Sequence, residues 1–115
     1  SMLMTPPAAL TLRLTFVTPD GPRAVTARCG TTLMEAARNA GLPGIVAECG
    51  GACVCATCHV HVAPEWQAVT GTPSATEAEM LDFAVDADES SRLSCQIRLT
   101  ARMDGLTVRV PERQA

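Results

Sequence analysis

The sequence contains no lysine and no tyrosine, and Phe16, Phe83 and Trp66 are its only aromatic residues. Binding of nucleic acid by stacking bases on aromatic side chains is therefore not expected. The apolar runs are much shorter than the ~20 residues that a membrane-spanning helix needs. Residues 1–9 also lack the basic start and the apolar stretch of a secretory signal. We expect a cytoplasmic protein that binds neither nucleic acid nor membrane.

Charge is distributed unevenly along the chain. The nine basic residues are all arginine, the acidic residues number twelve, and the formal net charge is −3. Between His61 and Arg92 there is no basic residue, yet seven acids fall in this interval: Glu65, Glu77, Glu79, Asp82, Asp86, Asp88 and Glu89. A solvated helix face is one interpretation of this stretch, and a docking surface for a basic partner is the other.

The first half of the chain predicts a hairpin followed by a helix. Apolar residues alternate with polar ones over residues 10–16, which is the period of a half-buried strand, and residues 19–22 form a turn signal before the next strand. Thr32 and Glu35 have the spacing of a capping box, and Gly41 is a typical stop signal. A helix is therefore expected over about residues 33–40.

The second half predicts three strands and one more helix. Residues 59–62, 93–97 and 106–110 have the composition of strands, and Ser74 with Glu77 matches a second capping box. This second helix should run to about Ala84, with Met80 and Leu81 facing inward. Strands and helices in this order indicate one α+β domain, a mixed sheet packed by a helix.

Four of the six cysteines have the spacing of a metal site. Cys49, Cys55 and Cys58 lie in ECGGACVCATCHV, and Cys95 follows in SRLSCQI after 36 intervening residues. This C-x5-C-x2-C pattern has one residue more than the plant-type pattern whose four thiolates hold two irons. Cys53 is an alternative first ligand by spacing, and Cys29 is expected to be a small core residue.

Other uses of the same residues are possible. A zinc site built from Cys55, Cys58, His61 and Cys95 is the main alternative, because C-x2-C is common in zinc modules. Cys58 and His61 also form half of a Rieske pattern, but the partner C-x-H motif is absent. A disulfide framework fits less well, since three of the cysteines crowd among glycines.

Three separated segments resemble one known family. CGGACVCATCHVHV, EAEMLDF and SRLSCQIRLTARMDGLTVRVP are similar to the adrenodoxin and putidaredoxin group of [2Fe-2S] ferredoxins. The similarity runs from about Leu10 to Glu112, which implies a 2Fe-2S ferredoxin-type domain over residues 10–112, an N-terminal extension over 1–9 and a tail over 113–115. The implied fold is a β-grasp (ubiquitin-like) fold with a cluster-binding loop and an inserted acidic helix.

The resemblance also implies a cofactor and its ligands. One [2Fe-2S] cluster would be held by Cys49, Cys55, Cys58 and Cys95. Glycines leave room for a metal and small side chains keep a loop thin, and His59 matches a family histidine that braces the loop. The residues expected to support the cluster loop are Gly50, Gly51, Ala56, Thr57 and His59.

In the resembled family, acids on the inserted helix dock basic surfaces of two redox partners. Glu77, Glu79 and Asp82 match those positions, and Glu48 matches a further acid that recognises an oxygenase. The resemblance therefore implies a monomeric one-electron carrier, not an enzyme. It would take electrons from an FAD-containing NAD(P)H-dependent ferredoxin reductase and pass them to an oxygenase, in particular a cytochrome P-450. A ferredoxin that serves iron-sulfur cluster assembly and a zinc-stabilised interaction module remain as alternatives.

Overall fold

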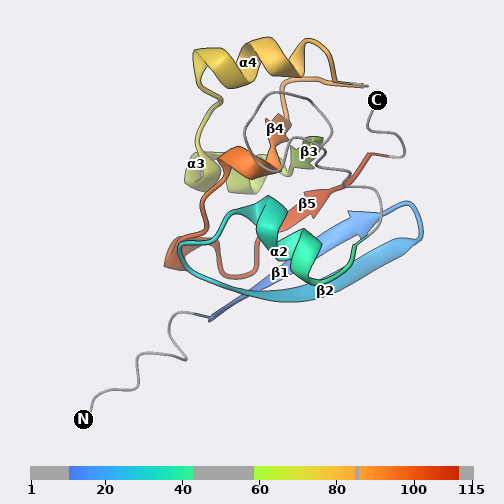
Figure 1. Cartoon of the computed structure of the whole chain (residues 1–115), viewed down its shortest axis with the longest axis vertical. Helices are drawn as coiled ribbons and strands as arrows, with labels where there is room; N and C mark the ends of the chain where they lie inside the picture. Colours follow the sequence, from blue (N-terminus) through green and yellow to red (C-terminus); the bar gives the residue numbers. More distant parts are fainter. Residues whose placement is uncertain (1–10, 43–58, 85, 112–115) are drawn as a thin grey trace.

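The computed structural model describes residues 11–42, 59–84 and 86–111 (Figure 1). In chain order its elements are β1 (Thr11–Thr18), β2 (Gly21–Arg28), α2 (Leu33–Asn39), β3 (His59–Val62), η1 (Pro64–Trp66), α3 (Gln67–Thr70), α4 (Ala75–Leu81), β4 (Ser91–Leu93), η2 (Ser94–Gln96), η3 (Ala101–Met103) and β5 (Thr107–Arg109).

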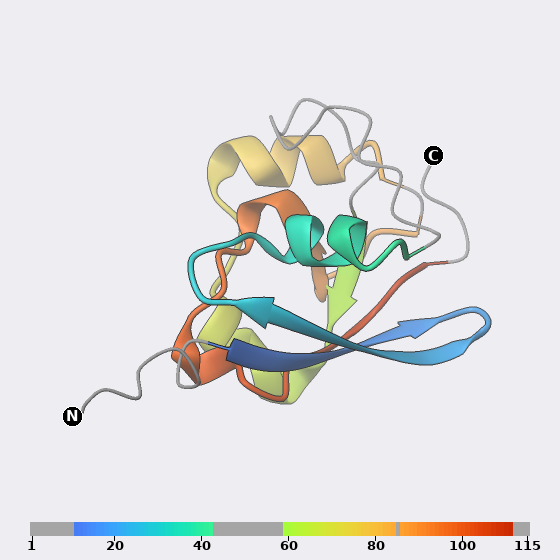
Figure 2. The same cartoon turned by 60° about the horizontal axis from the view of Figure 1, so that its bottom comes forward.

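The described strands form one mixed sheet in the order β2-β1-β5-β3-β4. β1 and β5 run parallel to each other, and the other neighbouring strands are antiparallel. Helix α2 lies over the β1–β2 hairpin, and α4 lies at the opposite end of the molecule beside β4 (Figures 1 and 2). This arrangement confirms the predicted α+β fold of the β-grasp type.

The predicted hairpin is present, and its first strand explains the position of the core. Leu12, Leu14 and Phe16 are buried, whereas the residues between them are exposed or half-buried. The hydroxyl of Thr18 donates to the carbonyl of Gly21 at 2.8 Å and closes the turn. Gly21 has a φ of 120°, a conformation that a side chain would disfavour. The residues of alternating polarity in the sequence thus form a strand whose apolar face lies in the core.

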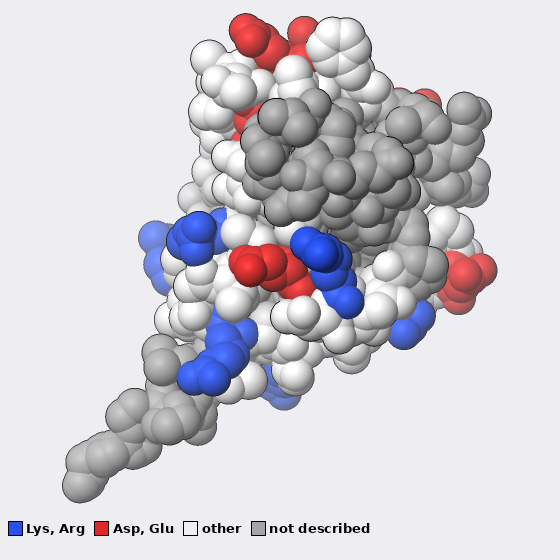
Figure 3. Space-filling view, viewed as in Figure 1, with Lys and Arg blue, Asp and Glu red and all other residues white. Residues whose placement is uncertain are grey.

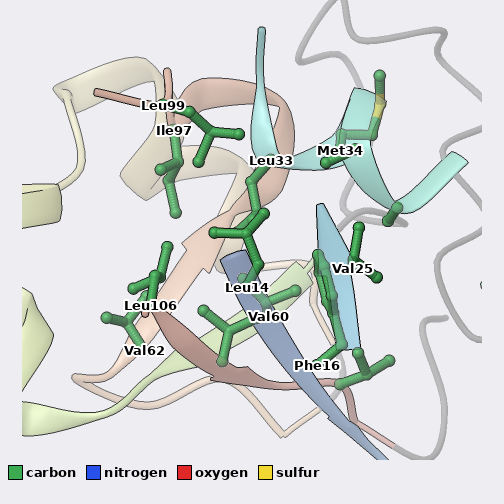
Figure 4. Packing of buried hydrophobic residues seen from close by; sticks show 14 of the residues in the cluster. Leu14, Phe16, Val25, Leu33, Met34, Val60, Val62, Ile97, Leu99 and Leu106 are labelled. Atoms are coloured by element: carbon green, nitrogen blue, oxygen red, sulfur yellow. The ribbon is translucent and has the colours of Figure 1, made fainter. Parts of the chain in front are cut away.

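Helix α2 covers this buried face. Leu33 and Met34 are buried in contact with the hydrophobic cluster that contains Leu14, Phe16 and Val25 (Figure 4). Each such side chain contributes roughly 1.5–3 kcal/mol when it is removed from water. α2 therefore owes its stability chiefly to its apolar face, since a helix of seven residues is too short to be stable alone.

The capping box predicted at the start of α2 is also present. The Thr32 hydroxyl accepts the backbone N–H of Glu35 at 3.1 Å, and the Glu35 carboxylate accepts the backbone N–H of Thr32 at 2.8 Å. These hydrogen bonds, led by the one from the Thr32 backbone, lower the pKa of Glu35. The helix ends at Asn39, one residue before the predicted end.

The second half of the chain differs from the prediction in one strand, in the end of one helix and in the short helical segments η1, α3 and η3, which were not predicted. Strand β3 has the predicted bounds, but the strand predicted over residues 93–97 is wrong, because β4 ends at Leu93 and the 3-10 helix η2 follows. Leu93 is the last residue of β4 and lies opposite His59 of β3. α4 ends at Leu81, three residues earlier than expected, and its last hydrogen bonds continue as a turn.

Candidate metal centre

Cys95 is the one predicted ligand that lies among the described residues. It sits in η2, directly after β4, and only 6% of its surface is exposed. The side-chain amide of Gln96 donates towards the Cys95 sulfur at 3.6 Å. The other predicted ligands, Cys49, Cys55 and Cys58, lie outside the described residues, as do Cys53, Glu48, Gly50, Gly51, Ala56 and Thr57.

The sheet brings the two cysteine-bearing regions of the sequence to neighbouring strands. His59 follows Cys58 in the chain and is the first residue of β3, where it pairs with Leu93 of β4. Cys95 comes two residues after Leu93. The strand that follows Cys58 in the sequence and the strand that precedes Cys95 are therefore neighbours in the sheet.

The donor set can be tested within the described part of the chain. Residues 11–42, 59–84 and 86–111 contain no group of three or more His, Cys, Asp or Glu side chains that could hold a metal ion. A metal site that includes Cys95 must therefore take ligands from outside these ranges, where the cysteine-rich segment lies. A buried thiol in such a place fits an iron-sulfur centre, because these centres use soft thiolate ligands.

His59 is completely buried at the start of β3. Its Nε2 lies 2.7 Å from the Ser91 hydroxyl, and its ring lies 4.6 Å from the ring of His61 between centroids. The same Ser91 hydroxyl accepts the backbone N–H of Asp88 at 2.8 Å. His59 is therefore tied through one serine to β4 and to the loop before it. These contacts fit the predicted role of a histidine that braces the fold beside the cysteine segment.

His61 holds the same loop at a second point. Its Nδ1 lies 2.8 Å from the Ser90 hydroxyl and 3.2 Å from a carboxylate oxygen of Asp88. Burial lowers the pKa of His61 below its ordinary value of 6.5, and Arg109 lowers it further, while Asp88 opposes the shift. Hydrogen bonds from Ser90 are the main cause of a lowered pKa for Asp88. His61 is thus predominantly neutral in the folded protein near pH 7.

A buried ion pair lies between α4 and β4. The Arg92 guanidinium donates to both carboxylate oxygens of Glu77, at 2.7 and 3.0 Å, and to the carbonyls of Thr70 and Gly71. The carboxylate also accepts the backbone N–H of Leu93 at 2.8 Å. Glu77 is 1% exposed and Arg92 is 6% exposed. We call this group the Glu77–Arg92 clamp. It joins α3, α4 and β4, and Arg92 lies two residues before the start of η2 at Ser94.

The clamp corrects two predictions about Glu77. Its carboxylate does not complete a capping box with Ser74, because it points to Arg92, although the Ser74 hydroxyl does accept the Glu77 backbone N–H at 3.2 Å. A carboxylate that is buried and bound in this way is also not available for docking a partner. The positions of the acids in the sequence do not show that Glu77 is buried while the others are exposed. The signal that could have revealed it is Arg92, the basic residue that ends the acidic stretch.

The other two acids predicted on this helix are placed differently. Glu79 and Asp82 are exposed, at the end of α4 and just beyond it. On the face shown in Figure 3, acidic atoms without arginine neighbours lie at the α4 end, whereas the lower half carries the arginines together with some acidic atoms. The α4 end of this face is therefore negative.

Removal of the Glu77 carboxylate should destabilise the protein strongly. Glu77→Ala leaves the Arg92 guanidinium buried without its counter-ion, which costs about 3–5 kcal/mol and should lower the apparent melting temperature of the holoprotein by roughly 10 °C or more. Glu79→Ala is the matched control, since an exposed acid two positions along the same helix should change stability by less than about 0.5 kcal/mol. Equal melting temperatures for both variants would contradict the clamp.

The free energy of unfolding should also decrease as the pH is lowered, because His61 titrates differently in the folded and unfolded states. Unfolded chains take up a proton near the ordinary pKa of 6.5, whereas the folded protein takes it up only at lower pH. The unfolded state then binds more protons in this interval, so the free energy of unfolding falls as the pH decreases through it. The lowered pKa of Asp88 acts in a more acidic range, below 3.8.

His61→Asn keeps a donor for Asp88 and Ser90 but does not titrate. We expect the apparent melting temperature of the wild-type holoprotein, measured at one scan rate, to decrease between about pH 7.5 and 5.5. The variant should show a clearly smaller decrease. A variant as pH-sensitive as the wild type would assign the effect to other groups.

Comparison with known proteins agrees with this centre. The family model of the 2Fe-2S iron-sulfur cluster binding domain matches residues 17–100. A ferredoxin named CarAc from a Sphingomonas species is 55% identical over 91 residues, which cover 79% of this chain and 84% of the relative. The crystal structure of a ferredoxin from Rhodopseudomonas palustris HaA2 has a TM-score of 0.86 and 48% identity, covering 90% of this chain and 99% of that one.

A further match comes from a complex. The crystal structure of a covalent complex of putidaredoxin reductase with putidaredoxin contains a chain similar to this one, with a TM-score of 0.81 and 39% identity. The match covers 88% of this chain and 99% of that chain. The resemblance inferred from three short motifs therefore extends over most of the chain and favours an iron-sulfur cluster over the zinc alternative. The chain belongs to the adrenodoxin- and putidaredoxin-type [2Fe-2S] ferredoxins, electron carriers that bind one [2Fe-2S] cluster and are not enzymes.

Proposed function

We propose that this ferredoxin takes single electrons from an FAD-containing NAD(P)H-dependent ferredoxin reductase and passes them to an oxygenase, specifically a cytochrome P-450. The observation that carries the proposal is the position of the acidic end of α4, which packs against β4 immediately before Cys95. A negative surface beside the redox centre attracts a basic partner to the place where electrons leave. The reductase complex formed by putidaredoxin supports the first half of this route.

The ligands in this proposal are Cys49, Cys55, Cys58 and Cys95. When bound, the cluster supplies a one-electron redox couple, and the residues of the chain hold and tune it. Cys95 has little contact with solvent, and the Gln96 amide donates towards its sulfur. Hydrogen bonds to the sulfurs and limited solvent access are the means by which a protein sets the reduction potential.

Docking in this proposal depends on Glu79 and Asp82, with Glu48 as a further candidate. The first two are exposed on the element that packs against β4. Exposed charges increase the rate of encounter while adding little affinity, which suits a carrier that has to leave one partner before it meets the next. Glu77 supports docking indirectly, because the clamp fixes α4 in place.

A reconstituted electron-transfer chain tests the proposal. The purified holoprotein is mixed with NADH or NADPH and with flavoprotein ferredoxin reductases, putidaredoxin reductase among them, and reduction is followed by bleaching of the visible absorption. The reduced protein is then mixed with oxidised P-450 enzymes. Efficient transfer to a P-450 supports the proposal. Transfer only to a cluster-assembly system would favour the alternative that the ferredoxin serves iron-sulfur cluster assembly.

The ligand set is tested by single cysteine substitutions. Cys49→Ser, Cys55→Ser, Cys58→Ser and Cys95→Ser should each lower the iron and sulfide content or alter the visible spectrum, because each removes one thiolate. Cys53→Ser is the matched control and should keep the wild-type spectrum with about two irons and two sulfides per chain. Loss of the cluster from Cys53→Ser with retention in Cys49→Ser would reverse the assignment of the first ligand.

Charge reversal tests the docking surface. Asp82→Arg and Glu79→Arg should each lower the rate of reduction at low ionic strength by about tenfold, because steering by the acidic end of α4 is weakened. The difference from the wild type should shrink as salt is added. Asp20→Arg makes the same change in net charge at the hairpin turn, away from α4, and should have a much smaller effect. Equal effects of Asp20→Arg and Asp82→Arg would show that net charge, not the location of the acids, controls the rate.

A further inference from the structure

Phe83 is the one large hydrophobic side chain among the described residues that is exposed, with 76% of its surface accessible. The chain has few aromatic residues, and the other two lie in or against the core. Phe16 is fully buried, and Trp66 packs against the hydrophobic cluster. Isolated exposed apolar residues are common on protein surfaces, so exposure by itself indicates no function. The surroundings of Phe83 are what give it significance.

The position of Phe83 is fixed by the turn that follows α4. Its backbone N–H donates to the carbonyl of Met80 at 3.0 Å, and the neighbouring N–H of Asp82 donates to Glu79 at 3.2 Å. Leu81 is buried and Met80 packs against the core, so the inner side of this turn is occupied. Phe83 therefore extends into solvent from a turn held by the backbone, and an exposed aromatic in such a place loses little conformational freedom on binding.

The exposed ring lies within the acidic docking surface. It is next to Asp82 and one helical turn after Glu79, both of which are exposed, and the sequence between His61 and Arg92 contains no basic residue. A second copy of this chain is a poor occupant of such a surface, because two negative faces repel each other. A basic protein surface with an apolar hollow is complementary to both features, since aromatic anchors surrounded by charges are typical of binding hot spots.

We propose that Phe83 is an apolar anchor for the reductase and inserts into a hollow framed by Lys and Arg side chains of the reductase. This inference rests on the proposed function. The reductase is chosen as the partner because a similar chain forms a complex with such an enzyme. The acids and the ring then have separate tasks. Glu79 and Asp82 control the rate of encounter, whereas Phe83 slows dissociation of the complex that has formed.

This separation has a measurable signature in the dependence on salt. Burial of an aromatic ring does not rely on charge attraction, so its contribution persists when added salt screens the acids. Phe83→Ala should raise the KM for the ferredoxin in its reduction by the reductase about tenfold, both at low ionic strength and at roughly 0.3 M salt. Asp82→Arg, in contrast, should show its effect mainly at low salt.

The experiment uses the holoprotein and the reductase that reduces the wild type most efficiently in the assay described above. Phe83→Leu is the conservative variant and should recover most of the wild-type KM, because it restores an apolar side chain at the same place. Cluster content and melting temperature should be unchanged in both variants, since the side chain is exposed. These two measurements separate a docking role from a structural one.

The outcomes are distinct. Failure of every reductase to reduce the wild type would refute the proposed function, and this inference with it. Efficient reduction of the wild type with an unchanged KM for Phe83→Ala would overturn the inference alone. An effect confined to the oxygenase step would also overturn it, by assigning the anchor to the other partner. Sedimentation showing a wild-type dimer that Phe83→Ala dissolves would identify a second copy as the occupant.

Discussion

The buried pair of Glu77 and Arg92 is the interaction on which the arrangement of the site depends. The guanidinium binds both oxygens of the carboxylate and two carbonyls at the end of α3, while the carboxylate also accepts the Leu93 backbone N–H. Two charges removed from water are tolerated only with such complete hydrogen bonding. The result is that three elements meet at one point beside Cys95, so the acidic helix and the predicted ligand are fixed relative to each other.

Two histidines of β3 hold β4 and the loop before it in place by further contacts. His59 contacts Ser91, and His61 contacts Ser90 and Asp88, so the loop that leads into β4 is held against β3. The residue before His59 is Cys58. Cys95 follows Leu93 by two residues, so these contacts also hold the strand that leads to this predicted ligand. Polar contacts achieve this with a directional precision that apolar packing alone lacks.

The acids of this region have different surroundings. Glu77 faces inward and holds the fold, whereas Glu79 and Asp82 are exposed and are the acids to which the proposed function assigns docking. Surface charges contribute little to stability, so substitutions at Glu79 and Asp82 should leave the fold intact. An exposed aromatic at Phe83 adds an apolar contact to a surface otherwise dominated by charge.

Several local elements and the kind of metal ligand could be predicted from the amino-acid sequence alone, although a zinc site remained as an alternative until the comparison with known proteins. Alternation of apolar residues predicted β1, the Thr32–Glu35 spacing predicted the start of α2, and the cysteine spacing predicted a cluster site, since these features depend on residues close in the chain or on the ligand chemistry of thiolates. The end of β4 and the identity of the buried acid became clear from the three-dimensional fold. β4 gives way to the 3-10 helix η2 at Ser94, and the burial of Glu77 follows from Arg92, fifteen positions away, which local patterns of charge do not specify.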